Sequence, residues 1–163
     1  MIRTIIDPTR KLLSSEQFGA SVGCIIPASM SRLRRPLVLV VEDHHDTRDL
    51  YGAYLGLQGF DVLTARNGME GFTRACESRP DVIVTDLILP TIDGWELVRR
   101  LKADERTNVI PIVVVSGWVL ASAQEKVEQL GCASFLAKPC LPEVLTSELH
   151  RVLTDQKALT TAV

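Results

Sequence analysis

The sequence predicts an α/β protein in which helices cover both faces of a parallel five-stranded sheet. From Pro36 onward, short runs rich in Val, Ile and Leu alternate with segments of helical periodicity, which is the pattern expected of βαβ units. Four of these runs also end directly before polar residues suited to phosphate chemistry. Because the carboxyl ends of parallel strands lie along one edge of a sheet, we expect those polar residues to meet in one crevice.

Five strands are predicted from the apolar runs. Each run is short, is rich in β-branched or aliphatic residues and is followed by a segment of helical spacing, which favours a buried parallel strand. The expected strands span residues 37–42, 61–65, 82–86, 110–116 and 134–137.

The first two helices are predicted from their apolar spacing and their ends. The first spans about 46–58 and is followed by Gly59, a favoured residue just past a helix end. Its apolar face is expected to contain Leu50, Tyr54 and Leu57. The second spans about 68–78, and Pro80 closes it because proline disfavours a helical residue directly before it.

Three further helices complete the alternation. The third opens at Asp93-Gly94, and the fifth starts near Pro142, a favoured residue in a first turn. Between them, a fourth helix at about 121–130 has few apolar anchors, so we expect it to be the least firmly held. The inward residues are expected to be Leu97, Val98 and Leu101 in the third helix, Ala123, Val127 and Leu130 in the fourth, and Leu145, Leu149 and Val152 in the fifth. On the third helix, solvent is expected to surround Arg99, Arg100 and Lys102.

The two ends of the chain do not fit this alternation. Residues 1–35 contain scattered Pro and Gly, lack a persistent apolar stripe and carry a net charge of +4, whereas the remainder carries −6. We therefore expect a flexible basic N-terminal extension at 1–35, one domain at 36–153 and a short polar C-terminal tail at 154–163, with no output domain. Met30 offers an alternative start of translation.

The composition narrows the class of protein. Hydrophobic residues make up 46% of the chain and charged residues 23%, which is typical of a soluble globular protein. No apolar run approaches the roughly 20 residues that cross a bilayer, and no signal peptide is expected. An acidic domain without a basic stripe argues against direct nucleic acid binding. The four cysteines form no CxxC pair, which favours reduced thiols and a cytoplasmic location.

The polar residues at the strand ends predict a magnesium-dependent phosphoryl site. An aspartate carboxylate such as that of Asp86 is a competent nucleophile toward phosphorus and forms an acyl phosphate. Mg²⁺ (or Mn²⁺) prefers oxygen ligands and neutralises charge on phosphoryl oxygens. The candidate metal ligands are the carboxylates of Glu42, Asp43 and Asp86 and the backbone carbonyl of Ile88. The candidate contacts to phosphoryl oxygens are the Ser116 hydroxyl and the Lys138 ammonium.

Each of these residues also has an ordinary structural interpretation. A lone Asp at a strand end is usually a turn former or helix cap, a Ser before Gly is usually a turn, and a Lys before Pro is usually a surface residue. Their joint occurrence, each directly after an apolar run, favours the functional interpretation. A metal site at His44-His45 beside Asp46 is a weaker alternative, because adjacent side chains rarely share one ion.

Four motifs contain these residues and carry a family resemblance. They are VVED (Val40 to Asp43), VTDLILPTIDGWEL (Val84 to Leu97), VVVSG (Val113 to Gly117) and FLAKP (Phe135 to Pro139). With them, residues 36 to about 153 resemble the CheY-like receiver domain of bacterial two-component response regulators. The resemblance covers about three-quarters of the chain, and the combined motif is highly specific.

The resemblance implies a fold and a set of residue roles. The sheet would be flavodoxin-like, with strand order 2-1-3-4-5. Asp86 would take a phosphoryl group from a histidine kinase or histidine phosphotransfer protein, with Mg²⁺ held by Glu42 and Asp43. Ser116 and Lys138 would contact the phosphoryl group, and the bond between Lys138 and Pro139 would be cis. Phe135 would be the aromatic switch that turns inward as Ser116 moves, although it also fits an ordinary core position.

The resemblance further implies a signalling protein without an output domain and without substrate turnover. It would act through phosphorylation-dependent contacts with a downstream protein, as a monomer or a weak phosphorylation-dependent dimer, without binding nucleic acid or membrane. Two alternatives stay open: a haloacid-dehalogenase-type phosphatase, which needs a second Asp at the position of Ile88, and a non-phosphorylated interaction module of the same fold.

Two residues beside the site depart from the small or polar residues common in this family. Ile88 is apolar and branched, and Trp118 is the bulkiest residue available. We hypothesise that they shield the acyl phosphate from water and prolong the signal. Trp118 alternatively contacts a partner protein.

Overall fold

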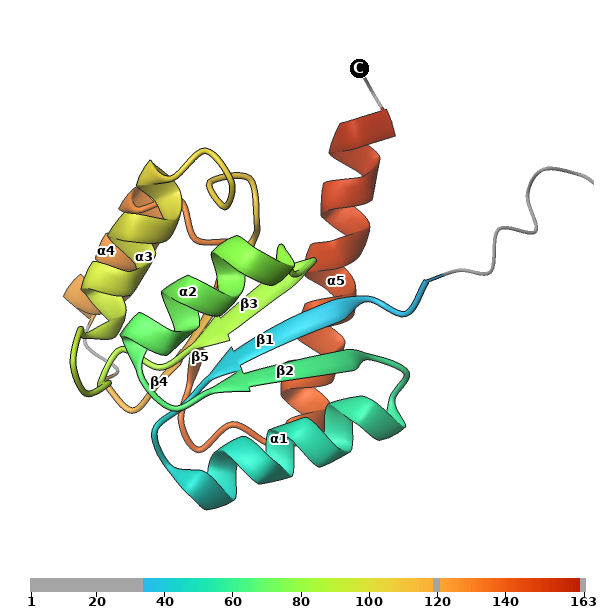
Figure 1. Cartoon of the computed structure of the whole chain (residues 1–163), viewed down its shortest axis with the longest axis horizontal. Helices are drawn as coiled ribbons and strands as arrows, with labels where there is room; N and C mark the ends of the chain where they lie inside the picture. The colour runs from blue at the N-terminus through green and yellow to red at the C-terminus, as the bar shows by residue number, and fades with distance from the viewer. Residues whose placement is uncertain (1–33, 119–120, 162–163) are drawn as a thin grey trace, which may run out of the picture. The chain divides into compact units, whose positions relative to one another are not determined.

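The computed structural model describes residues 34–118 and 121–161. In this part of the chain strands and helices alternate (Figure 1). The strands are β1 (Leu37–Val41), β2 (Asp61–Ala65), β3 (Val82–Thr85), β4 (Ile112–Ser116) and β5 (Ser134–Ala137). The helices are α1 (His45–Leu57), α2 (Gly68–Ser78), α3 (Gly94–Ala103), α4 (Ala121–Gln129) and α5 (Pro142–Thr161).

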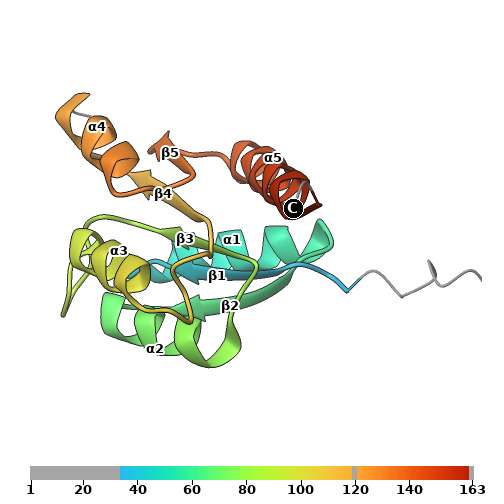
Figure 2. The ribbon, with the colours of Figure 1, turned by 90° about the horizontal axis from the view of Figure 1, so that it is seen from above.

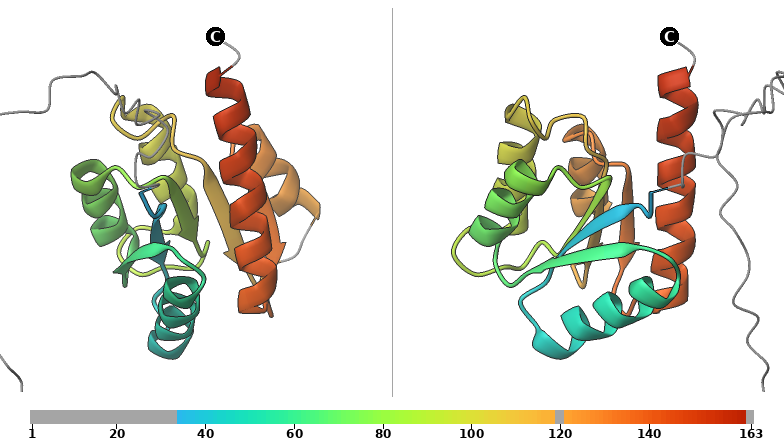
Figure 3. Two further views of the ribbon diagram at one scale, coloured as in Figure 1. Left: turned by 90° about the vertical axis from the view of Figure 1, so that its right-hand side faces the viewer. Right: turned by 45° about the vertical axis from the view of Figure 1, so that its right-hand side comes forward.

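The five strands form one parallel sheet of order β2-β1-β3-β4-β5. This result confirms the predicted fold class and strand order. The helices α2, α3 and α4 contribute to the buried cluster on one face of the sheet, and α1 and α5 contribute to the cluster on the other face. Figures 2 and 3 show α2 and α3 on the side of the sheet away from α5.

Side chains of the central strands alternate between the two clusters. Leu39 and Ile83 belong to the cluster under α2, α3 and α4, whereas their neighbours Val38 and Val84 belong to the cluster under α1 and α5. This is the two-residue period of a strand with both faces buried. It explains why the strands appear in the sequence as continuous apolar runs. No helix in the described residues is long and apolar enough to span a bilayer.

The predicted apolar face of α1 was wrong. Leu50 and Leu57 are 53% and 84% exposed, and the buried residues of the helix are Tyr51 and Leu55. Tyr51 and Leu55 are one turn apart and pack in the cluster shared with α5. The sequence contains two overlapping stripes at helical spacing, and spacing alone does not distinguish them. For α3, α4 and α5 the predicted inward residues are buried or pack against the core.

Two element ends differ from the predicted ones by more than one residue. β4 begins at Ile112 rather than 110, because Pro111 has no N–H to donate and Ile110 N donates to Thr107 O in a turn. α5 continues to Thr161, so residues 154–161 are helical and do not form a separate tail.

Lys102 was expected in solvent, yet it is half-buried. Its ammonium donates to the carbonyls of Asn108 and Ile110, both at 3.3 Å.

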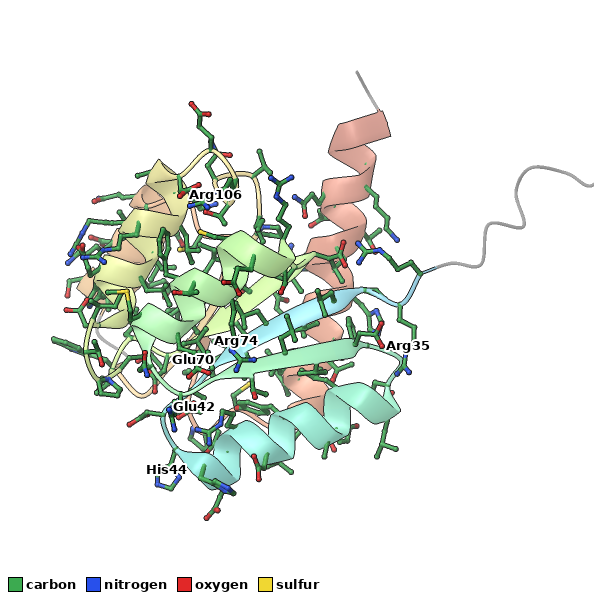
Figure 4. All side chains as sticks on the ribbon, viewed as in Figure 1. Arg35, Glu42, His44, Glu70, Arg74 and Arg106 are labelled. Atoms are coloured by element: carbon green, nitrogen blue, oxygen red, sulfur yellow. The ribbon has the colours of Figure 1, made fainter. Side chains whose placement is uncertain are left out.

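Arg34 and Arg35, expected in the extension, make contacts with the domain. Arg34 pairs with Asp81 at 2.7 Å. The Arg35 guanidinium donates to the carbonyls of Gly56, Gly59 and Phe60 at the end of α1, and Figure 4 shows it beside that end. Carbonyl oxygens at the C-terminal end of a helix carry partial negative charge, which favours a nearby cation. The rest of the predicted extension, residues 1–33, lies outside the described residues.

Candidate functional site

Three carboxylates meet where β1 and β3 end. Val41 and Thr85 are paired across the sheet, so the residues that follow them, Glu42 with Asp43 and then Asp86, leave the same edge. One oxygen from each of these three carboxylates lies within 4.8 Å of the others. Glu42 and Asp86 are buried, whereas Asp43 is exposed. The structure therefore brings together acids that the sequence separates widely.

The Asp86 carboxylate is held in one orientation by its own backbone. Its Oδ1 accepts hydrogen bonds from the N–H groups of Leu87 and Ile88, the latter at 3.1 Å. Its backbone N donates to Val41 O at 3.2 Å. These contacts anchor one carboxylate oxygen and leave Oδ2 directed toward Lys138.

The Lys138 ammonium connects two of the acids. Its Nζ lies 2.6 Å from Asp86 Oδ2 and 2.7 Å from Glu42 Oε2. Burial alone would lower the pKa of Lys138, but hydrogen bonds and attraction from Asp86 and Glu42 raise it above its ordinary value. Lys138 stays charged, and its positive charge partly neutralises the two buried carboxylates. The peptide bond between Lys138 and Pro139 is cis, as the resemblance implied.

The hydroxyl and aromatic candidates lie on the neighbouring strands. Ser116 is the last residue of β4 and is fully buried, and its Oγ accepts a hydrogen bond from Trp118 N at 3.3 Å. Its carbonyl accepts from Lys138 N at 2.9 Å. Phe135 on β5 is half-buried and packs against the cluster under α2, α3 and α4. In this structure the Ser116 hydroxyl is thus bonded within its own turn.

An open pocket of about 350 Å³ lies over the acids. Its lining residues are Glu42, Asp43, His44, Thr47, Asp86, Ile88, Gly117 and Lys138. Ile88 is 63% exposed at this pocket, and Trp118, which is 48% exposed, directly follows the lining residue Gly117. His44 and Thr47 were not predicted as lining residues. They reach the pocket because α1 begins immediately after the acids, as Figure 4 shows for Glu42 and His44.

Arg48 is a further residue that the sequence did not identify. Its guanidinium Nη1 donates to the backbone carbonyls of Glu42 at 2.9 Å and Asp43 at 3.2 Å. The residue lies in the first turns of α1, so this contact ties the helix back to the loop that presents both acids. The sequence offered one signal, a basic residue within two turns of an acidic pair.

The donor set fits a hard divalent cation. Three carboxylates close together repel one another, and Mg²⁺ prefers such oxygen ligands. Among the described residues, Glu42, Asp43 and Asp86 are the group that could hold a metal ion. The alternative at His44-His45 is not assembled: the His45 imidazole instead lies 3.5 Å from Asp46 and 3.4 Å from Asp49 on the surface of α1.

Comparison with known proteins agrees with this geometry. Residues 38–150 match the family described as "Response regulator receiver domain". The chain is 32% identical over 102 residues to the polar-differentiation response regulator DivK of Brucella anthropi. This match covers 63% of this chain and 83% of DivK. It is similar to the structure of the chemotaxis response regulator CheY4 of Vibrio cholerae, with a TM-score of 0.69, 29% identity and coverage of 72% and 98% of the two chains. A CheY-like receiver domain protein from Methanospirillum hungatei shares the fold, with a TM-score of 0.71, 22% identity and coverage of 76% and 98%.

Proposed function

Because this chain belongs to the family of response regulator receiver domains, we propose that Asp86 accepts a phosphoryl group from a histidine kinase or a histidine phosphotransfer protein. The observation that supports this role is the buried Asp86 carboxylate, which lies between two further acids and the Lys138 ammonium. In the transfer, a carboxylate oxygen of Asp86 forms a bond to phosphorus while the bond from phosphorus to the donor imidazole nitrogen breaks.

The acids have a second task in this proposal. The carboxylates of Glu42, Asp43 and Asp86 and the carbonyl of Ile88 would hold Mg²⁺ or Mn²⁺. The cation, when bound, neutralises charge on the phosphoryl oxygens. Lys138, which now pairs with Asp86 and Glu42, would contact one phosphoryl oxygen as a point charge.

The signal in this proposal is a local rearrangement. The Ser116 hydroxyl would leave its bond with Trp118 N and turn toward the phosphoryl group, and Phe135 would move inward after it. Phosphorylation would then change the surface over β4 and β5 and select a downstream protein. Such contacts are supported by exposed apolar residues on the segments that follow β3, β4 and β5. These residues are Ile88, Trp118, Leu141 and Val144. The cytoplasm is the compartment that fits this role.

Substrate turnover is not expected from this site. Ile88 is apolar and therefore cannot serve as the general acid that a haloacid-dehalogenase-type phosphatase needs there. If the chain forms a phosphoprotein but does not hydrolyse p-nitrophenyl phosphate, the result would support the receiver role. Steady release of p-nitrophenol would instead support the phosphatase.

Phosphotransfer profiling tests the proposal directly. The purified chain is mixed with each phosphorylated histidine kinase of the host in the presence of Mg²⁺, and the Asp86→Ala variant is the control. We expect label on the unsubstituted chain, none on the variant, and none when EDTA removes the cation. Label on Asp86→Ala would show that another residue accepts the phosphoryl group and would overturn the assignment.

A further inference from the structure

A buried tyrosine on α1 makes a hydrogen bond to the segment that carries Lys138. Tyr51 is 3% exposed, and its hydroxyl donates to the backbone carbonyl of Cys140 at 2.9 Å. A buried hydroxyl costs free energy unless it is hydrogen-bonded, and an apolar side chain would fill a core position without that requirement. The hydroxyl therefore has a structural partner that Phe or Leu would lack.

The segment from Lys138 to Leu141 joins β5 to α5 and is fixed at several points. Lys138 N donates to Ser116 O at 2.9 Å, and Leu141 O accepts from the first turn of α5. Between these two points, the Tyr51 hydroxyl is the contact that joins the segment to α1. Burial, together with Cys140, raises the pKa of Tyr51 far above its ordinary value, so the hydroxyl stays a donor at neutral pH.

The contacts form a closed ring around the site. Glu42 lies three residues before the start of α1, and α1 carries Tyr51. The Tyr51 hydroxyl donates to the carbonyl of Cys140, two positions after Lys138. Lys138 then returns to Glu42 at 2.7 Å and to Asp86 at 2.6 Å. The lysine and the acids are thus held relative to one another by α1 as well as by the sheet.

We propose that Tyr51 is a positioning residue for phosphoryl transfer, which holds the Lys138 ammonium at the distance that Asp86 chemistry requires. The inference rests on the proposed phosphorylation of Asp86. A charged group helps transfer only while it is aligned with the reacting oxygens, and small displacements are costly. Losing one hydrogen bond of ordinary net strength is expected to slow phosphorylation about three- to tenfold.

The test compares two tyrosines of the same helix. Tyr51→Phe removes the hydroxyl and keeps the ring in the core. Tyr54→Phe is the matched control, because Tyr54 interacts with Glu143 of α5, which lies outside the segment from Lys138 to Leu141. The initial rate of phosphorylation by acetyl phosphate with Mg²⁺ is measured from the mass of the intact protein, and thermal melting verifies the fold of both variants.

A double-mutant cycle separates positioning from general packing. Tyr51→Phe should slow the unsubstituted chain about three- to tenfold but should have no further effect in a Lys138→Ala background. Mg²⁺ affinity, measured without phosphodonor, should stay unchanged. Three outcomes would overturn this inference and leave the proposed function standing. They are equal phosphorylation rates for Tyr51→Phe and Tyr54→Phe, additive losses of rate in the cycle, and weakened Mg²⁺ binding by Tyr51→Phe. If the unsubstituted chain accepts no phosphoryl group, the proposed function and this inference both fail.

Discussion

Gly94 determines how closely α3 approaches the residue proposed to take phosphate. A Cβ built on Gly94 would lie 2.1 Å from Asp86 O and 2.6 Å from Leu87 Cα. The Gly94 N–H donates to Leu87 O at 2.9 Å. The first turn of α3 therefore rests directly on the backbone that orients the Asp86 carboxylate, and only a residue without a side chain fits there.

We expect Gly94→Ala to destabilise the protein by about 3 kcal/mol or more, because backbone must shift to admit the methyl group. Gly56→Ala is the control: Gly56 lies inside α1, and its added Cβ would meet nothing within 4 Å. That substitution should leave stability unchanged or raise it by up to about 1 kcal/mol. Urea unfolding measures both, and equal stabilities of the two variants would contradict the packing argument.

Ile88 should govern how long the site keeps its phosphoryl group. It is apolar, lines the pocket and lies beside the acids, so we expect it to exclude water from an acyl phosphate on Asp86. Ile88→Asn is expected to shorten the half-life of the phosphoprotein about three- to tenfold, and Trp118→Ala to shorten it less. The half-life is measured after removal of the donor, with Val109→Ala as an exposed control away from the pocket. A half-life of seconds that neither substitution changes would refute the shielding hypothesis.

At the scale of elements, α2 shows how a helix end adjacent to the site is fixed. Asn67 precedes the helix and its Oδ1 accepts from Glu70 N at 2.8 Å, while Glu70 Oε2 accepts from Arg66 N at 3.0 Å. This reciprocal arrangement resembles a capping box. Hydrogen bonds from the Arg66 backbone and from Arg74 lower the pKa of Glu70 below its ordinary value.

The lowered pKa of Glu70 gives a prediction about pH. A carboxylate with a depressed folded pKa stabilises the fold above its ordinary pKa of 4.5 and loses that contribution as pH falls through the folded value. Glu70→Gln should therefore lower the free energy of unfolding by about 1 kcal/mol at pH 7. This gap in stability between the variant and the unsubstituted chain should close in acid. Thermal melting across pH measures this gap. A gap that persists in acid would contradict the charge-based explanation.

The sequence predicts the elements better than it predicts their faces and ends. Strands appear as apolar runs because both sheet faces are covered, and Gly59 marks the end of α1 because it has a φ of 93°. The buried stripe of α1 could not be predicted, since Tyr51 and Leu55 are selected by tertiary packing against α5. The length of α5 was missed because its last turns have no apolar period to extend the pattern.

At the scale of the whole molecule, parallel topology explains how much of the site is predictable. Strand ends converge whenever strands run parallel, so the acids and Lys138 could be expected at one edge without knowledge of any contact. Contacts between distant segments could not be predicted in this way. The Arg48 bonds to the acid loop and the Tyr51 bond to Cys140 depend on side-chain positions that only the folded chain defines.

The clustered acids predict that the stability of the whole domain depends on magnesium. Glu42, Asp43 and Asp86 repel one another, and a cation that binds only the folded chain stabilises it by mass action. At a concentration about 100 times its dissociation constant, Mg²⁺ should stabilise the fold by about 2.7 kcal/mol. Thermal melting with Mg²⁺ and with EDTA measures the effect. Asp43→Asn should reduce the effect, and an equal shift in that variant or with NaCl would argue against a specific site.

The domain boundary can be tested by truncation. All proposed site residues lie at or after Glu42, so deletion of residues 1–29 should leave phosphorylation of Asp86 intact. Deletion of 1–35 also removes the Arg34 pair with Asp81 and the Arg35 bonds to three carbonyls at the end of α1. That longer deletion should lower the free energy of unfolding by about 1–3 kcal/mol. Urea unfolding and acetyl phosphate labelling of both truncations provide the measurement. Loss of labelling in the shorter deletion would show that the extension takes part in the site, and equal stability of the two would show that the arginines do not anchor the domain.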